Sequence, residues 1–383
     1  MKHGIVMLVS GLIFAGCVAA TKENVPMNYY GYAGCTVDEK KEGIHLLVCN
    51  TQDGSFQRVG VLSNVVGTTY FVLDRSCKHL YTFQEDPQLA KPLNAVAVCY
   101  AIGPTALREI NRIPLHAGVP CHISLDQKEE AIVWADYGNA IAGVCALKAD
   151  GSLDTAVPTV TIQHTGSGPD KPRQDKAHAH CAWVTPDNRY LGIVDLGLDQ
   201  VKFYDFATWK SGLKEVPSLT IKTAPGAGPR HILFHQNKQL MFLLNELNNT
   251  ISTYRYTGHS FEHICTLPTL PADFKAFSKT AAVKLTADGK MVFASNRGHD
   301  SIAAYDVDAQ TGMLTLRAIS PLAGKFPRDF ELMPGEKFVL VGHEMSNEIQ
   351  TYALDRAKGT LTPVGAPFSV HKPLCFKFGT PAH

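Results

Sequence analysis

The sequence predicts an all-β fold, a seven-bladed β-propeller made of four-stranded antiparallel blades. Three observations predict it: a repeat of about fifty residues, short strand-like runs inside each repeat, and a length of 383 residues that holds about seven repeats. The best-preserved repeat spans residues 225–256. Its apolar runs at 232–234, 240–244 and 251–256 are separated by polar turns, which is typical of three successive strands.

Four clear copies of this repeat are recognised by the segment that closes the second turn. These segments are VDLGLDQV (194–201), LNELNNTI (244–251), SNRGHDSI (295–302) and GHEMSNEI (342–349). Their last residues follow one another at intervals of 50, 51 and 47 positions. WADYGNAI (134–141) is a fifth copy and YTFQED (81–86) is a weaker sixth. A period of this length, built from short strands, indicates propeller blades.

The two chain ends are expected to share the seventh blade. There the N-terminal runs 27–34 and 44–49 would join the last run, PLCFKF (373–378). Joining the ends in one sheet closes the ring and removes free sheet edges. Residues 165–176 (TGSGPDKPRQDK) lack apolar periodicity and lengthen one repeat, so we expect a loop there, beside the site.

Residues 1–20 predict a signal sequence in front of a propeller domain at 25–383. Lys2 precedes an apolar run (5–15) that is too short to span a bilayer and suits a signal-peptide core. The AGC that follows is typical of a bacterial lipoprotein signal, with Cys17 as the lipidated residue. Plain cleavage a few residues later and an N-terminal apolar strand are the alternatives. We expect an exported protein, periplasmic or lipid-anchored in the cell envelope, with a cytoplasmic location as the alternative.

Composition excludes several classes of partner. The formal net charge of +1 gives no electrostatic basis for binding nucleic acid. Contact with a membrane is expected only through a lipid anchor at Cys17, and the protein is expected to be a monomer. Ten cysteines occur without any C-x-x-C, so a structural zinc site is not expected. Several lie in strand-like runs, where a buried free thiol is the simplest interpretation, although this is unusual for an exported protein.

Two columns of the repeat carry the residues that could perform chemistry. Counted back from residues 201, 251, 302 and 349, the position 21 before holds His180, Arg230, Ala281 and Arg328. The position 5 before holds Leu196, Glu246, Arg297 and Glu344. The first column begins the inner strand of a blade and the second ends the next strand, so both lie at one mouth of the central channel. His122 and Asp136 are the nearest equivalents in the preceding blade.

The residue types in these columns differ from blade to blade, which does not suit one repeated packing role. A third column is uniform instead, and its side chains are expected to close the second turn by bonding backbone amides: Asp199, Asn249, Asp300 and Asn347.

Arginines that converge on one mouth suit an anionic ligand, because guanidinium pairs with carboxylate or phosphate. A histidine and a glutamate beside them could move a proton during attack on a carbonyl. The predicted catalytic residues are His180, Arg230, Glu246 and Arg297. The predicted substrate-binding residues are His178, His231, Arg328 and Glu344. Two alternatives stay open: arginine–Glu246 ion pairs that brace neighbouring blades, and a His180 that only bonds backbone at a strand start.

Other motifs are absent or incomplete. Gly226-Ala227-Gly228 lacks the Lys-Ser/Thr of a phosphate-binding loop and leads into a strand rather than a helix. No G-x-S-x-G is present, so a serine hydrolase has no support. His178 and His180 have no obvious third ligand nearby in the sequence, so neither a metal nor another cofactor is expected.

At these residues the chain resembles the lactonase family of seven-bladed β-propellers. That family contains bacterial propeller-type 6-phosphogluconolactonases and fungal 3-carboxy-cis,cis-muconate cyclases. The resemblance spans essentially the whole mature chain and is carried by YYGYAG, HAHCAWVTPDNRYLGIVDLGLDQV, GAGPRHILFHQNKQLMFLLNELNNTISTY, ASNRGHDSIAAYDVDAQTGML, FPRDFELMPGEKFVLVGHEMSNEIQTY and PLCFKF. The proposed catalytic set of the muconate-cyclising relatives falls here on His180, Arg230, Glu246 and Arg297.

The resemblance implies hydrolysis of a sugar lactone, 6-phosphogluconolactone or a related anionic lactone, as the expected activity. Its sugar-phosphate members are usually cytoplasmic, so the signal sequence favours another sugar or an organic-acid lactone. Two alternatives remain: a cyclase of the carboxy-cis,cis-muconate type, and a non-catalytic exported propeller that binds a ligand. The sequence does not assign the general base between His180 and Glu246.

Overall fold

The computed structural model describes residue 1 and residues 27–382, apart from 36–42, 64 and 67. The predicted signal sequence after Met1, including Cys17, therefore lies outside the described residues. None of the helices in the part that is described has the length and apolar character needed to cross a membrane.

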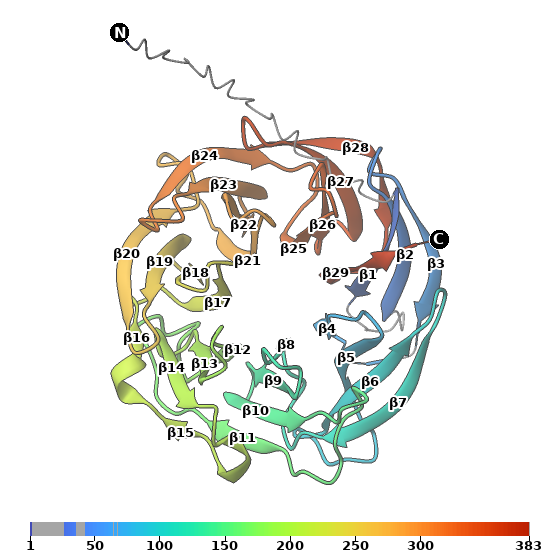
Figure 1. Cartoon of the computed structure of the whole chain (residues 1–383), viewed down its shortest axis with the longest axis vertical. Coiled ribbons are helices and arrows are strands. Elements are labelled where there is room, and N and C mark those ends of the chain that lie inside the picture. Colours follow the sequence, from blue (N-terminus) through green and yellow to red (C-terminus); the bar gives the residue numbers. More distant parts are fainter. Residues whose placement is uncertain (2–26, 36–42, 64, 67, 383) are drawn as a thin grey trace.

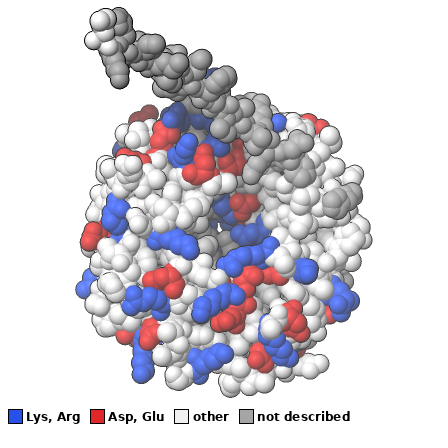
Figure 2. Space-filling view, in the orientation of Figure 1, with Lys and Arg blue, Asp and Glu red and all other residues white. Residues whose placement is uncertain are grey.

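Seven antiparallel sheets form a ring around a central axis, as Figure 1 shows, and the hollow at the centre of Figure 2 marks the channel along this axis. One sheet contains both ends of the described chain. From the channel outward its strands are β29 (Pro373–Pro381), β1 (Asn28–Cys35), β2 (Ile44–Asn50) and β3 (Phe56–Leu62). The predicted seven-bladed propeller, with its ring closed by N- and C-terminal strands in one blade, is confirmed.

The next blades follow the chain around the ring, each written from the channel outward. They are β4 (Phe71–Leu73), β5 (His79–Glu85), β6 (Ala95–Ile102) and β7 (Leu107–Pro114); then β8 (His122–Leu125), β9 (Ala131–Asp136), β10 (Ile141–Ala146) and β11 (Val160–Gln163). The blade after these has β12 (Ala179–Val184), β13 (Tyr190–Asp195) and β14 (Gln200–Asp205), with β15 (Lys214–Glu215) and β16 (Ile221–Lys222) both paired to β14. The short 3-10 helices η1 (Trp209–Ser211) and η2 (Pro217–Leu219) connect its outer strands.

The last three blades have four strands each. They are β17 (Pro229–Phe234), β18 (Leu240–Asn245), β19 (Thr250–Tyr256) and β20 (Phe261–Pro268); β21 (Lys279–Leu285), β22 (Met291–Arg297), β23 (Ser301–Val307) and β24 (Leu314–Pro321); and β25 (Pro327–Leu332), β26 (Phe338–His343), β27 (Glu348–Asp355) and β28 (Thr360–Ser369). The runs predicted at 232–234, 240–244 and 251–256 fall within β17, β18 and β19.

The hydrophobic core lies between blades rather than inside one of them. Seven clusters of buried side chains occur among the described residues, and each joins two neighbouring sheets. One, for example, packs Val201 and Phe203 of β14 against Ile232 of β17 and Met241 of β18. Because each fully buried large apolar side chain contributes about 1.5–3 kcal/mol, these interfaces hold the blades in place.

The Asp/Asn column joins successive blades. Asp199, Asn249, Asp300 and Asn347 all have φ between 53° and 56°, a left-handed conformation that these residue types tolerate. Their side chains reach the segment that leads into the next blade. Asp199 accepts hydrogen bonds from the amides of Gly226 and Gly228, and Asp300 accepts one from Phe326. The column was predicted to close its own turn, and most of its bonds tie the turn to the neighbouring blade.

Apart from Cys35, which is buried, the cysteines of the described residues are eight free thiols. Six of these eight are buried, and Cys77 and Cys121 are partly exposed. This confirms the prediction of mostly buried free thiols.

Candidate active site

Three of the predicted residues are the extra residue of a β-bulge at the start of an inner strand. In β12 the pairing with β13 passes from Ala179 to Cys181 and skips His180. The same shift skips Arg230 in β17 and Arg328 in β25. A bulge re-aims the side chain of its extra residue. Here Arg230 and Arg328 line a cavity of about 10 Å³ within the channel, no larger than a single water molecule.

The register of the third blade corrects one sequence expectation. Ile141 pairs with Asp136 as Gln200 pairs with Asp195, so the true equivalent of Val201 is Ala142 rather than Ile141. Counting back from Ala142 places Cys121 and Tyr137 in the two columns. His122 and Asp136, the equivalents expected from the sequence, are each displaced by one residue. Cys121 also lines the channel cavity beside Arg230, as the register requires.

Glu246 joins three arginines from three different parts of the chain. It follows β18, and its Oε2 atom lies 3.0 Å from Arg230 Nε and 2.8 Å from Arg297 Nη2. Its Oε1 atom lies 2.7 Å from Nη2 of Arg173, which belongs to the 165–176 loop. The side chains of Glu246, Arg230 and Arg297 are at most 7% exposed, so this cluster is withdrawn from water.

The arginines decide the charge of Glu246. Burial by itself raises the pKa of this carboxyl, but the charges of Arg297, Arg230 and Arg173 outweigh it and hold the pKa well below its ordinary value. Glu246 is therefore a carboxylate at neutral pH and has no proton to donate. Burial lowers the pKa of Arg297 to about 10, which still leaves the guanidinium charged.

His180 is a neutral imidazole. Burial first, and then the charge of Arg230, hold its pKa well below its ordinary value. Its Nδ1 atom lies 3.7 Å from the sulfur of Cys121, and its ring meets those of Tyr137 and His231 edge to face. Burial raises the pKa of Cys121 to about 12, so this neighbour is a protonated thiol rather than a nucleophile.

His178 and His231 are both close to His180, and their contacts differ. His231 touches the His180 ring directly, whereas the Tyr137 ring contacts both His178 and His180. The His178 ring stacks on Tyr137 with centroids 4.2 Å apart, and its Nδ1 lies 3.0 Å from the carbonyl oxygen of Tyr137. His231 contacts Arg230 Nη1 at 3.1 Å and packs against the ring of His122. His231 also lines a separate cavity of about 250 Å³ with Trp183, Phe234 and Lys284, which lies beyond the arginine cluster.

Arg328 and Glu344 form a pair of their own. Arg328 Nη1 lies 3.1 Å from Glu344 Oε1, and the two side chains are 30% and 19% exposed. No ion pair among the described residues joins this couple to Glu246. They face the same mouth as the cluster but are more accessible to water.

Arg173 and Tyr137 were not among the predicted site residues. The Arg173 guanidinium donates to Glu246 and to the Tyr137 hydroxyl, at 2.7 and 3.2 Å. The loop itself was expected beside the site, so its single arginine was a usable signal. Tyr137 could have been found by anchoring the third copy of the repeat at Ala142.

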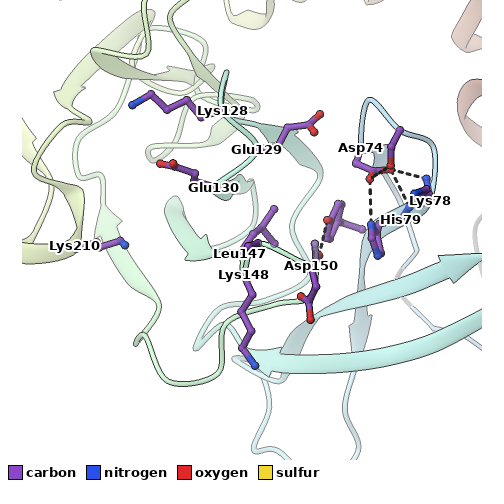
Figure 3. Close-up of a pocket in the computed structure, with 14 residues that line it drawn as sticks. Asp74, Lys78, His79, Lys128, Glu129, Glu130, Leu147, Lys148, Asp150 and Lys210 are labelled. Atoms are coloured by element: carbon purple, nitrogen blue, oxygen red, sulfur yellow. Dashed lines mark hydrogen bonds and ion pairs between the residues drawn. The ribbon is translucent and has the colours of Figure 1, made fainter.

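The channel opens at the centre of the disc, and on the face drawn in Figure 2 this opening is a hollow bordered by basic and acidic side chains. A cavity larger than the two beside Arg230 and His231 lies elsewhere. It measures about 830 Å³ and is formed by the turns after β4 and β8 and the segment after β10, on the face opposite Glu246. None of the predicted site residues lines this cavity. Figure 3 shows that its charged side chains are of mixed sign: Asp74, Lys78, Lys128, Glu129, Glu130, Lys148, Asp150 and Lys210.

No group of three or more His, Cys, Asp or Glu side chains in the described part of the chain is placed to hold a metal ion. The arrangement around Glu246 offers buried guanidinium donors, a carboxylate and a neutral imidazole at one mouth. Those groups can bind an anion, stabilise negative charge on an oxygen, and accept a proton.

Known proteins resemble this chain in sequence and in fold. The family described as "Lactonase, 7-bladed beta-propeller" matches residues 30–378. A 6-phosphogluconolactonase of Bacillus subtilis is 32% identical over 354 residues, which cover 91% of this chain and 98% of the relative. An uncharacterized protein of Lactococcus lactis is also 32% identical, over 84% of this chain and 91% of its own length.

Among solved structures, the periplasmic gluconolactonase PpgL of Pseudomonas aeruginosa superposes with a TM-score of 0.85 at 26% identity. The match covers 93% of this chain and 100% of that one. Fold, length and sequence agree from one end of the propeller to the other. The chain therefore belongs to the lactonase family of seven-bladed β-propellers.

Proposed function

We propose that this protein is an enzyme that hydrolyses a sugar lactone carrying an anionic group, 6-phosphogluconolactone or a close relative. The observation that carries the proposal is the buried cluster in which one carboxylate, Glu246, faces three guanidinium groups beside a neutral His180. The cluster keeps an excess of positive charge at the channel mouth. The names of two relatives, a 6-phosphogluconolactonase and a gluconolactonase, support a lactone as the substrate.

In the proposed reaction, water attacks the lactone carbonyl and the ring C–O bond then breaks. His180 is assigned to accept the proton from water, because its ring is neutral and one ring nitrogen carries a lone pair that can bind a proton. Glu246 is a poor base, since each of its oxygens already accepts hydrogen bonds from guanidinium groups. The proton finally reaches the ring oxygen, which leaves as the hydroxyl of the open-chain acid.

Arg297 is assigned to the oxyanion that forms at the carbonyl. Its Nη2 atom is held by Glu246 and by the Thr280 carbonyl oxygen, at 2.8 and 2.9 Å. Its Nε atom is buried and has no hydrogen-bond partner among the described residues. A buried donor left unpaired costs about 1–3 kcal/mol, so an oxyanion that formed beside it would be favoured.

The test is the rate of hydrolysis of 6-phosphogluconolactone and glucono-1,5-lactone above the spontaneous rate. We expect His180→Ala and Arg297→Ala each to lower kcat/KM by about 100-fold or more, in line with the loss of a general base or an oxyanion donor. Arg317→Ala, which removes a surface arginine paired with Asp306, is the matched control and keeps wild-type rates. Full activity in the His180 and Arg297 variants would contradict the mechanism.

A further inference from the structure

Arg173 stands apart from the other two arginines that bind Glu246. It lies in a loop outside the repeat, whereas Arg230 and Arg297 occupy the repeated columns. Its side chain is 26% exposed, against 5% for Arg230 and 7% for Arg297. Of the three guanidinium groups, it is therefore the one nearest to solvent and the first that an incoming ligand meets.

The loop holds Arg173 in place through the next residue. Gln174 is fully buried, and its amide nitrogen donates to the Leu196 carbonyl oxygen and to Asp199 Oδ1, at 2.9 and 2.7 Å. Its side-chain oxygen accepts a hydrogen bond from the Asp170 amide at 3.0 Å. A side chain whose neighbour is bonded in this way loses less conformational freedom when it binds a ligand. The loop thus presents a pre-positioned guanidinium at the mouth.

The two terminal nitrogens of the Arg173 guanidinium differ, because Nη2 makes hydrogen bonds and Nη1 has no partner among the described residues. Nη2 bonds Glu246 and the Tyr137 hydroxyl. Nη1 is buried and has no partner among the described residues. Among the described residues of the cluster, one other guanidinium nitrogen is buried without a hydrogen-bond partner, namely Nε of Arg297. The side chain of Arg297 is less exposed than that of Arg173. Two unpaired donors at two depths suit a substrate with two negatively charged points, a reacting carbonyl oxygen and a distal anionic group.

We propose that Arg173 is a specificity-determining residue, whose Nη1 binds the distal phosphate or carboxylate of the substrate while Nη2 remains on Glu246. This inference rests on the proposed lactonase function. Arg297 then serves the carbonyl oxygen, and the 165–176 loop decides that charged lactones are preferred over neutral ones. The contact between Arg173 Nη2 and Glu246 need not break, because a guanidinium offers five donors, but the buried Nη1 must become accessible when the substrate enters.

The test compares kcat/KM for 6-phosphogluconolactone with kcat/KM for uncharged glucono-1,5-lactone. In the wild type the phosphorylated lactone is preferred. Arg173→Ala lowers the ratio of the two values by about 10- to 100-fold, the worth of one hydrogen-bonded charge pair, mainly through KM of the phosphorylated substrate. Arg173→Lys keeps the positive charge but cannot bind Glu246 and the substrate anion with two separate nitrogens. Its preference for the phosphorylated lactone should therefore lie between those of Arg173→Ala and the wild type. Lys171→Ala removes a charge from an exposed residue of the same loop and leaves the ratio unchanged.

The outcomes separate this inference from the proposed function. If the wild type hydrolyses neither lactone, the proposed function is wrong. If it hydrolyses both and Arg173→Ala weakens both equally, the lactonase function stands and Arg173 only supports Glu246. A wild type that prefers the uncharged lactone also overturns the inference. Thermal unfolding of each variant shows whether a loss of activity comes from loss of the fold.

Discussion

At the residue scale, Glu246 remains charged although it is buried, because arginine side chains pair with its carboxylate. Its carboxylate is almost inaccessible to water, and three guanidinium groups from separate blades and a loop surround it. Such a group is stable as an ion only while its partners remain, because removing one side leaves buried charge uncompensated. The cluster therefore links neighbouring blades as well as forming the candidate site, so the bracing alternative and the catalytic one are compatible.

We expect Glu246→Ala to lower the free energy of unfolding by about 3–5 kcal/mol, because it leaves three arginines facing one another in a buried region. Urea denaturation at neutral pH measures this. Glu344→Ala is the matched control, since its pair with Arg328 is more exposed and costs about 1 kcal/mol or less. Equal losses in the two variants would contradict the strong coupling inferred for Glu246.

The buried histidines predict how stability depends on pH. Burial lowers the pKa of His122 to about 3, and burial followed by Arg230 lowers the pKa values of His180 and His231. Each folded pKa lies below the ordinary value of about 6.5, so the unfolded chain binds more protons as the pH falls. Stability should therefore be full above about pH 6.5 and decrease below it, by about 1 kcal/mol per pH unit for each histidine.

Unfolding free energies measured between pH 8 and pH 5 test this dependence. The carboxyl of Glu246 adds to it only at lower pH, because a depressed pKa gives stability that is lost below its ordinary value of about 4.3. His122→Asn should give a shallower slope than the wild type, whatever its absolute stability. A wild-type stability that stays constant from pH 8 to pH 5 would show that these histidines are not buried as neutral rings.

At the scale of the element, strands were predictable and bulges were not. The alternation of apolar residues located β18 and β19 to within one residue and missed the first three residues of β17. The register shifts that skip His180, Arg230 and Arg328 depend on the partner strand as well as on the strand itself. The same reason explains the displacement by one residue at His122 and Asp136. Counting from Ile141 assumed a register that only the pairing with Asp136 reveals.

The 165–176 loop owes its conformation to Gln174 rather than to its own secondary structure. We expect Gln174→Ala to release the loop, because the variant loses the hydrogen bonds that its buried amide makes to Leu196, Asp199 and Asp170. Amide hydrogen exchange across the loop should become faster, while exchange in distant β27 stays unchanged. Lys171→Ala is the control within the same loop. Unaltered exchange in the Gln174 variant would mean that other contacts hold the loop.

At the scale of the whole molecule, the ring closes through the pairing of β29 with β1. Removing residues 373–383 deletes the innermost strand of that blade and exposes the edge of β1. We expect the truncated protein to aggregate or to unfold at a clearly lower temperature, since an unpaired edge invites association. Size-exclusion chromatography and thermal unfolding measure this. Deletion of residue 383 alone is the control, and a monomeric, stable truncated protein would contradict the role given to ring closure.

The sequence by itself determined a propeller of about seven blades, the strands of its clear repeats, the closure of the ring and the placement of His180, Arg230, Glu246 and Arg297 at one mouth. These features follow from a local pattern that recurs about every fifty residues, because each repeat forms the same hydrogen-bonded sheet. Only the tertiary structure decided that Arg173 reaches Glu246, 73 residues further along the chain. That contact joins a loop without periodicity to a blade formed later in the sequence, so packing and hydrogen bonds between distant segments determine it, and no local pattern encodes it.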